Sequence, residues 1–169
     1  LREFAVATPY VEAADWRRTL GNHARDMRKS FLSNPILSDL VLIRSALSQR
    51  AAQLGVQEVE LAVENLVQAG LTPEQAFDAY SAVSLHVRGS VVLQRLYEKN
   101  RASGGGPGDF GETMVYDAEA APLLTQVTRE GHRIGAADDP NFEYGLNCIL
   151  DNVERQITEG RKSVKSRKG

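Results

Sequence analysis

The 169-residue sequence carries a formal net charge of −2, because its 22 Asp and Glu residues slightly outnumber its 20 Lys and Arg residues. Domains that bind nucleic acids through their own surface usually carry an excess of positive charge, so the composition argues against direct DNA binding by this chain. A single cysteine, Cys148, excludes an internal disulfide and a cysteine-rich zinc site. Together with the lack of a signal peptide or an apolar run of about 20 residues, it favours a cytoplasmic protein with no membrane partner.

Apolar residues recur three or four positions apart along most of the chain, which predicts an all-α fold. Residues 1–12 are expected to be a linker. A first helix is predicted over residues 14–33, where Leu20 and Met27 belong to one apolar stripe. Pro35 ends this helix, because the residue before a proline is disfavoured in the helical region.

Two further helices are predicted before the middle of the chain. The first is a short apolar segment over residues 36–47, and the second covers residues 57–69. Gly55 is expected to interrupt the chain between them, and Gly70 to close the second helix at its carboxyl end.

The clearest helix start in the sequence lies at Thr72. Its hydroxyl can cap a helix, Pro73 follows at the first helical position, and Gln75 lies three residues after the cap. The helix is predicted to run to about residue 98. Its centre is apolar or small on nearly every side, and such a helix must be covered on more than one side. This pattern indicates a partner for the helix.

The last third of the chain is predicted to contain a glycine-rich loop over residues 100–117, a helix over residues 118–131 and a long final helix. Asp139 and Pro140 supply the cap and the first position of that final helix, and residues 161–169 are expected to be a flexible basic tail. The final helix carries an apolar seam with nearly heptad spacing: Phe142, Leu146, Ile149, Val153 and Ile157.

The surplus apolar surface of the two long helices predicts a homodimer held by a four-helix bundle. We expect the final-helix seam to face the partner, together with His86 and Gly89 of the long helix. The alternative is that both helices lie at the centre of a monomeric bundle.

Three stretches of the chain, residues 15–20, 70–83 and 140–157, resemble successive helices of the C-terminal domain of the tetracycline-repressor family. The resemblance implies that residues 1–169 form an effector-binding and dimerisation domain. It also implies a helix-turn-helix head preceding Leu1, which would contact operator DNA, and a transcription regulator, expected to be a repressor, that a small molecule releases from DNA.

The same resemblance implies a ligand pocket between the first, third and fourth predicted helices. His23 falls where the family places a polar group that hydrogen-bonds the ligand, and Met27 where it places an aromatic side chain. Taken singly, several of the implied pocket residues are also typical core residues. The complete implied set is His23, Met27, Val59, Ala62, Val63, Phe77, Tyr80, Ser81 and Ser84.

Departures from the family pattern make tetracycline an unsuitable ligand. The segment 36–47 has no histidine to bind a metal, Leu93 occupies the position of a metal-binding carboxylate, and Ala62 replaces a glutamine. We therefore expect an apolar or aromatic effector, with no metal and no cofactor.

Two other functions are alternatives to ligand sensing. An enzyme is not expected, since the three histidines and one cysteine form no catalytic constellation, and residues 104–108 lack the Lys and Ser or Thr of a phosphate-binding loop. The second is a dimeric helical scaffold without a ligand. A closed cavity between the first, third and fourth helices would distinguish sensing from scaffolding.

Overall fold

The computed structural model describes residues 8–43, 49–104 and 117–166. These residues form helices and connecting segments and contain no strand. The elements are α1 (Trp16–Ser33), α2 (Pro35–Ser38), the π-helical turn η1 (Asp39–Ile43), α3 (Gln49–Ala69), α4 (Pro73–Ala102), α6 (Pro122–Arg129) and α7 (Asp139–Ser166). The all-α prediction is confirmed for this part of the chain.

Capping side chains determine where the main helices begin. Asp15 caps α1, and its Oδ1 accepts a hydrogen bond from the Arg18 backbone N–H at 2.7 Å. The capping box predicted at Thr72 is present, because the Gln75 N–H donates to Thr72 Oγ1 at 3.3 Å and the Thr72 N–H donates to Gln75 Oε1 at 3.0 Å. These bonds satisfy donors that the first turn of a helix leaves free.

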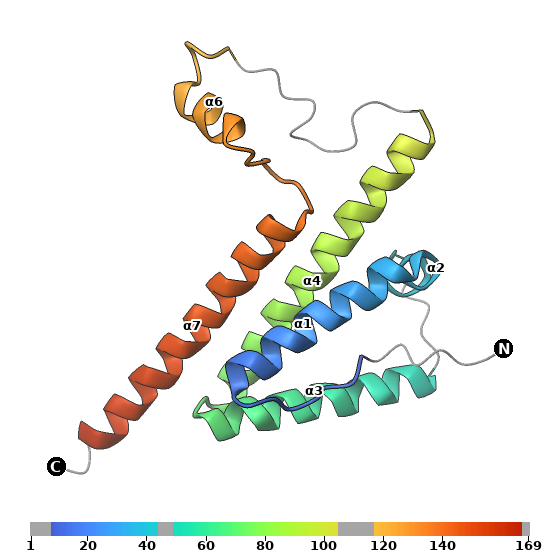
Figure 1. The fold of residues 1–169 in the computed structure, drawn as a ribbon. Coiled ribbons are helices and arrows are strands. Elements are labelled where there is room, and N and C mark those ends of the chain that lie inside the picture. The colour runs from blue at the N-terminus through green and yellow to red at the C-terminus, as the bar shows by residue number, and fades with distance from the viewer. Residues whose placement is uncertain (1–7, 44–48, 105–116, 167–169) are drawn as a thin grey trace.

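Helix α4 lies at the centre of the fold and packs against α1, α3 and α7 (Figure 1). Its inner face carries Ala76, Tyr80, Val83, Val87 and Val91, all of which are buried. The spacing of three and four residues along this face keeps it turned toward the neighbouring helices. The hydrophobic core therefore forms where α4 meets the three helices around it.

Helix α6 lies apart from this core, beyond the amino end of α7 (Figure 1). None of its eight residues is buried, and its apolar side chains at Leu123, Leu124 and Val127 are exposed. A helix of this length is marginal in water unless tertiary packing stabilises it. Within the described chain, no other element covers the apolar side chains of α6 to provide that packing.

The observed boundaries correct several sequence-based expectations. Helix α3 begins at Gln49, so Gly55 lies inside a helix and does not interrupt the chain. One glycine costs a helix only about 1 kcal/mol, which packing can outweigh. The residue that caps α7 is Asp138 and not Asp139. Asp138 Oδ1 accepts a hydrogen bond from the Asn141 N–H at 3.1 Å.

Two predicted segments also differ in length from those observed. Helix α6 begins only at Pro122, a residue suited to the first helical position. Helix α7 continues to Ser166, so most of the predicted tail over residues 161–169 is helical. Residues 44–48 and 105–116, which include parts of a predicted helix and a predicted loop, lie outside the described residues.

No described helix combines the length and hydropathy needed to cross a membrane.

Candidate ligand-binding site

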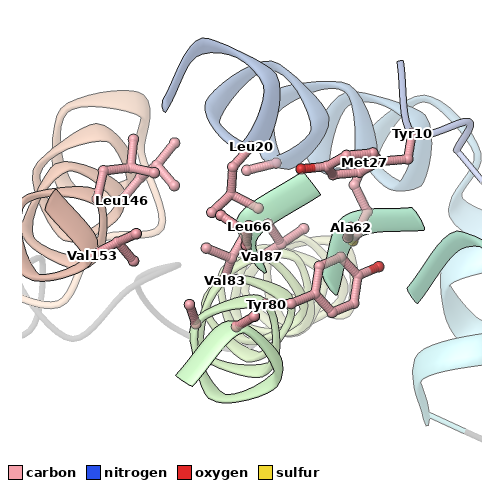
Figure 2. Packing of buried hydrophobic residues seen from close by; sticks show 14 of the residues in the cluster. Tyr10, Leu20, Met27, Ala62, Leu66, Tyr80, Val83, Val87, Leu146 and Val153 are labelled. Atoms are coloured by element: carbon pink, nitrogen blue, oxygen red, sulfur yellow. The ribbon is translucent and has the colours of Figure 1, made fainter. Parts of the chain in front are cut away.

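A small cluster of polar side chains, His23, Tyr80 and Tyr10, is buried among apolar residues where α1, α3 and α4 meet; we call it the His23 cluster. His23 of α1 is only 3% exposed, and its Nε2 lies 3.4 Å from the Tyr80 hydroxyl of α4. The two rings stack with centroids 5.8 Å apart. Figure 2 shows Tyr80 and Tyr10 with Met27 and Ala62 on one side of the core, away from the α7 residues Leu146 and Val153.

The second nitrogen of His23, Nδ1, is buried and makes no hydrogen bond of ordinary geometry. The Pro9 backbone carbonyl acts on the ring only outside that geometry, and the other ring nitrogen, Nε2, faces the Tyr80 hydroxyl. Leaving a buried donor or acceptor unsatisfied costs about 1–3 kcal/mol, so native structures rarely keep such atoms without a reason. An added hydrogen-bonding group beside this nitrogen would remove the cost.

Burial determines the charge states of this cluster. Desolvation lowers the pKa of His23 below its ordinary value, while the Pro9 backbone carbonyl, Glu58 and Asp26 act in the opposite direction to a smaller extent. Burial likewise raises the pKa of Tyr80, which Arg88 partly offsets. The histidine is therefore neutral and the phenol protonated near neutral pH, a combination that offers hydrogen bonds without a net charge.

Tyr10, which precedes α1, closes the cluster from a third direction. Its ring meets the His23 ring edge to face, with centroids 5.0 Å apart. Its hydroxyl donates to Asn65 Oδ1 at 3.1 Å, and its backbone N–H donates to Glu58 Oε2 at 2.5 Å. No pattern in the sequence indicated Tyr10, because a single aromatic residue in a segment without periodicity carries no local signal.

Six of the nine sequence-predicted pocket residues belong to this region. His23, Met27, Ala62 and Tyr80 are buried, and Val59 and Val63 are partly buried against the same core. Ser81 and Ser84 of α4 are of intermediate exposure. Phe77 is 54% exposed, so it does not belong to the buried cluster, although it lies only three residues before Tyr80 on α4. Its place in a ligand pocket stays a prediction.

The predicted dimer seam is used mostly within the chain itself. Phe142, Leu146, Val153 and Ile157 are at most 3% exposed, because α7 turns them toward α1 and α4. This corrects the expectation that they face a partner. Ile149 is partly buried against the same core.

His86 and Gly89, both on α4, differ in their surroundings. His86 packs on Phe142 within the same chain, with ring centroids 5.0 Å apart, so it too is used inside the subunit. Gly89 is exposed, and nothing lies within 4 Å of the position that a Cβ atom would occupy there. Gly89 therefore remains available to a partner.

Comparison with known proteins identifies the architecture. The family model described as the tetracyclin repressor-like, C-terminal domain matches residues 8–157. The chain belongs to the tetracycline-repressor family. No solved structure gives a significant match to it.

Curated relatives of this tetracycline-repressor-like chain come from mycobacteria. Proteins named HTH-type transcriptional repressor from two strains of Mycobacterium tuberculosis are each 56% identical to it over 164 residues, as is an uncharacterized HTH-type transcriptional regulator from Mycobacterium bovis. Each match covers 97% of this chain but only 63% of the relative. The chain thus spans less than two thirds of the length of these relatives.

Proposed function

We propose that this domain senses a small apolar or aromatic effector for a dimeric transcriptional repressor, which leaves its operator when the effector binds. In the proposed protein, a helix-turn-helix head of the kind that the relatives' names give contacts the DNA. The net charge of −2 argues against DNA binding by this domain itself. Release requires that the effector bind more tightly to the conformation that cannot engage DNA.

The observation that carries the sensing function is the buried His23 imidazole, whose Nε2 faces the Tyr80 hydroxyl while its Nδ1 makes no hydrogen bond of ordinary geometry. Small-molecule sites combine apolar walls with a few convergent polar groups. Met27 and Ala62 are apolar neighbours in the same part of the core, and a methionine side chain adapts readily to the shape of a ligand. A neutral ligand with one hydrogen-bonding group suits this combination, since burying a charge there would be costly.

Dimerisation is supported by an exposed apolar stripe on α4, opposite its inner face. Small and apolar residues recur there three or four positions apart, and Leu85 is 74% exposed. A hollow of about 390 Å³ between α4 and α7, lined partly by Ala82 and Ile149, adjoins the same side. Two copies joined through this stripe would form the four-helix bundle that the sequence predicts. The stripe comprises Ala82, Leu85, Gly89, Leu93 and Leu96.

Helix α6 gives the dimer a second source of buried surface. Its exposed Leu123, Leu124 and Val127 lack cover within the described chain, and the helix directly precedes α7. We propose that it packs against the partner subunit, which supplies the tertiary contacts that so short a helix needs.

The test of sensing is a thermal-shift screen of aromatic metabolites and antibiotics against the purified chain. A ligand that binds only the native state raises the melting temperature. Hits should lose most of their shift in Tyr80→Phe, which removes only the hydroxyl, and in Met27→Ala. The matched control is Tyr97→Phe, because Tyr97 also lies on α4 but bonds to the Gly135 carbonyl oxygen outside the cluster. Hits that respond equally to both tyrosine variants would move the site elsewhere.

A helical dimerisation module without an effector is the second candidate function. It is favoured by the position of three surface hollows of about 460, 510 and 390 Å³, which lie along α6, beside Arg28 and between α4 and α7. All three lie outside the His23 cluster. A screen without hits, combined with a stable dimer in solution, would favour this alternative.

A further inference from the structure

Tyr10 is a buried residue on a segment that is not helical. Residues 8–13 have no helical structure, yet the Tyr10 side chain is only 8% exposed. Tyr10 contacts two helices of the cluster. It meets α1 through the His23 ring, and α3 through Glu58 and Asn65. A residue so placed connects the cluster directly to the backbone that precedes α1.

The backbone between Tyr10 and α1 is held at its other end as well. The Ala13 N–H donates to Thr19 Oγ1 at 2.8 Å, and Thr19 Oγ1 donates to the Asp15 carbonyl oxygen at 2.7 Å. Residues 10–15 are thus tied to α1 and α3 by side-chain bonds. Because the segment is bonded at both ends, a displacement of the Tyr10 ring also moves the backbone of residues 10–15.

Of the walls around His23, the one that carries Tyr10 is the easiest to move. His23 and Tyr80 belong to helices of 18 and 30 residues, whose backbones are fixed by their own ladders of hydrogen bonds. Tyr10 is held by its burial and by two hydrogen bonds to side chains of α3. Elements that respond to ligands come from the less stable parts of a structure.

We propose that Tyr10 is the positioning residue that couples the His23 site to the chain preceding α1. A ligand seated against His23 and Tyr80 displaces the Tyr10 ring, releases its bonds to Asn65 and Glu58, and repositions residues 8–13. By linkage, a change imposed on that segment alters the affinity of the site to the same extent. The inference rests on the proposed sensing function, because it states how occupancy of that site leaves the domain.

The test uses the 169-residue chain with His23→Ala and imidazole as the probe. Removing the imidazole side chain leaves Tyr10 without its edge-to-face partner. Amide hydrogen exchange at Tyr10 and Ala13 should then rise about ten-fold relative to the unsubstituted chain. Free imidazole, added at millimolar concentrations, should return both amides toward their original rates by filling the vacated space.

The matched control is Leu146→Ala, which removes a fully buried side chain on α7, on the far side of the core. It should raise exchange at Tyr10 and Ala13 only as much as at other core amides, with no response to imidazole. The proposal is overturned if the two amides exchange no faster in His23→Ala than in this control. It is equally overturned if they exchange faster but imidazole has no effect, because filling the site then fails to reach the segment.

A reciprocal measurement decides the matter should His23→Ala fail to fold. Tyr10→Leu removes the ring that helps to bury His23, so the pKa of His23, followed by its ring NMR signals, should rise toward its ordinary value. Tyr10→Phe keeps the ring and should leave the titration nearly unchanged. Identical titrations in both variants would sink the coupling. Neither measurement uses the natural effector, so an unsuccessful effector screen would leave their result standing.

Discussion

His86 of α4 stacks on Phe142 of α7, with an interplanar angle of 12°, and its Nε2 lies 2.9 Å from the Phe142 carbonyl oxygen. The imidazole occupies space left open by Gly145, where a Cβ atom would lie 2.5 Å from His86 Cε1. This contact fixes the position of α4 along α7, because neither helix can slide without breaking it.

Gly145→Ala is expected to lower the free energy of unfolding by about 1–3 kcal/mol, because the added methyl group collides with the His86 ring and forces it to move. Urea denaturation measures the change. The control is Gly55→Ala, at a helical glycine with nothing within 4 Å of its Cβ position. That substitution should stabilise the chain by up to about 1 kcal/mol through helix propensity. Similar effects at both sites would contradict the proposed role of the contact.

Arg28→Met should destabilise the chain by about 1–3 kcal/mol, because Arg28 is 9% exposed and makes several contacts at once. Its Nη1 donates to Asp139 Oδ1, its Nη2 donates to the Ala137 carbonyl oxygen, and its guanidinium lies 4.6 Å from the Phe142 ring centroid. Arg28→Lys should not restore stability, since an ammonium group cannot make both bonds and stack on the ring.

The control for Arg28 is Arg155→Met, which breaks an exposed ion pair with Glu159. Such pairs contribute less than about 1 kcal/mol. Both stabilities can be read from urea denaturation at one pH. If the Arg155 variant proved as unstable as the Arg28 variant, the buried contacts of Arg28 would not be what stabilises this end of α1.

Stability should fall as the pH is lowered from about 6.5, the ordinary pKa of histidine, toward the lower folded-state pKa of His23. In that window the unfolded chain binds a proton that the folded chain, whose His23 is desolvated, does not. His23→Gln should flatten this part of the curve of unfolding free energy against pH.

A separate loss of stability is expected at lower pH. Arg25 lowers the pKa of Glu143, and Lys99 and Arg95 lower the pKa of Asp39. Depressed carboxylate pKa values stabilise the folded state above the unfolded-state pKa, and that contribution is lost as the pH falls below about 4.5. His23→Gln should leave this acidic limb unchanged. A wild-type curve that is level between pH 7 and pH 5 would contradict the assignment of a desolvated histidine.

Leu85→Lys should convert the proposed dimer into a monomer, because it places a charge in the apolar stripe of α4. Light scattering coupled to size exclusion should then report 18.5 kDa in place of twice that mass. Val56→Lys is the control, since Val56 is an apolar residue of α3 that is 67% exposed, against 74% for Leu85. A monomeric wild-type chain at micromolar concentration would refute the dimer itself.

Local features of the sequence were enough to determine most of the helices. The capping box at Thr72 and the apolar stripes of α1 and α4 depend on residues three or four apart, so they could be read without knowledge of the fold. The sequence also brought His23, Met27, Ala62 and Tyr80 into one predicted group, through a resemblance whose segments follow one another in the same order.

What only the tertiary structure decided is which face of each helix is covered by the chain itself. Periodicity identified the seam of Phe142 and Leu146 but could not say that α1 and α4 already bury it, leaving the opposite stripe of α4 exposed. Tyr10 became part of the site through contacts with residues 48 and 55 positions away. The physical reason is that burial depends on long-range packing, whereas caps and stripes depend on neighbours along the chain.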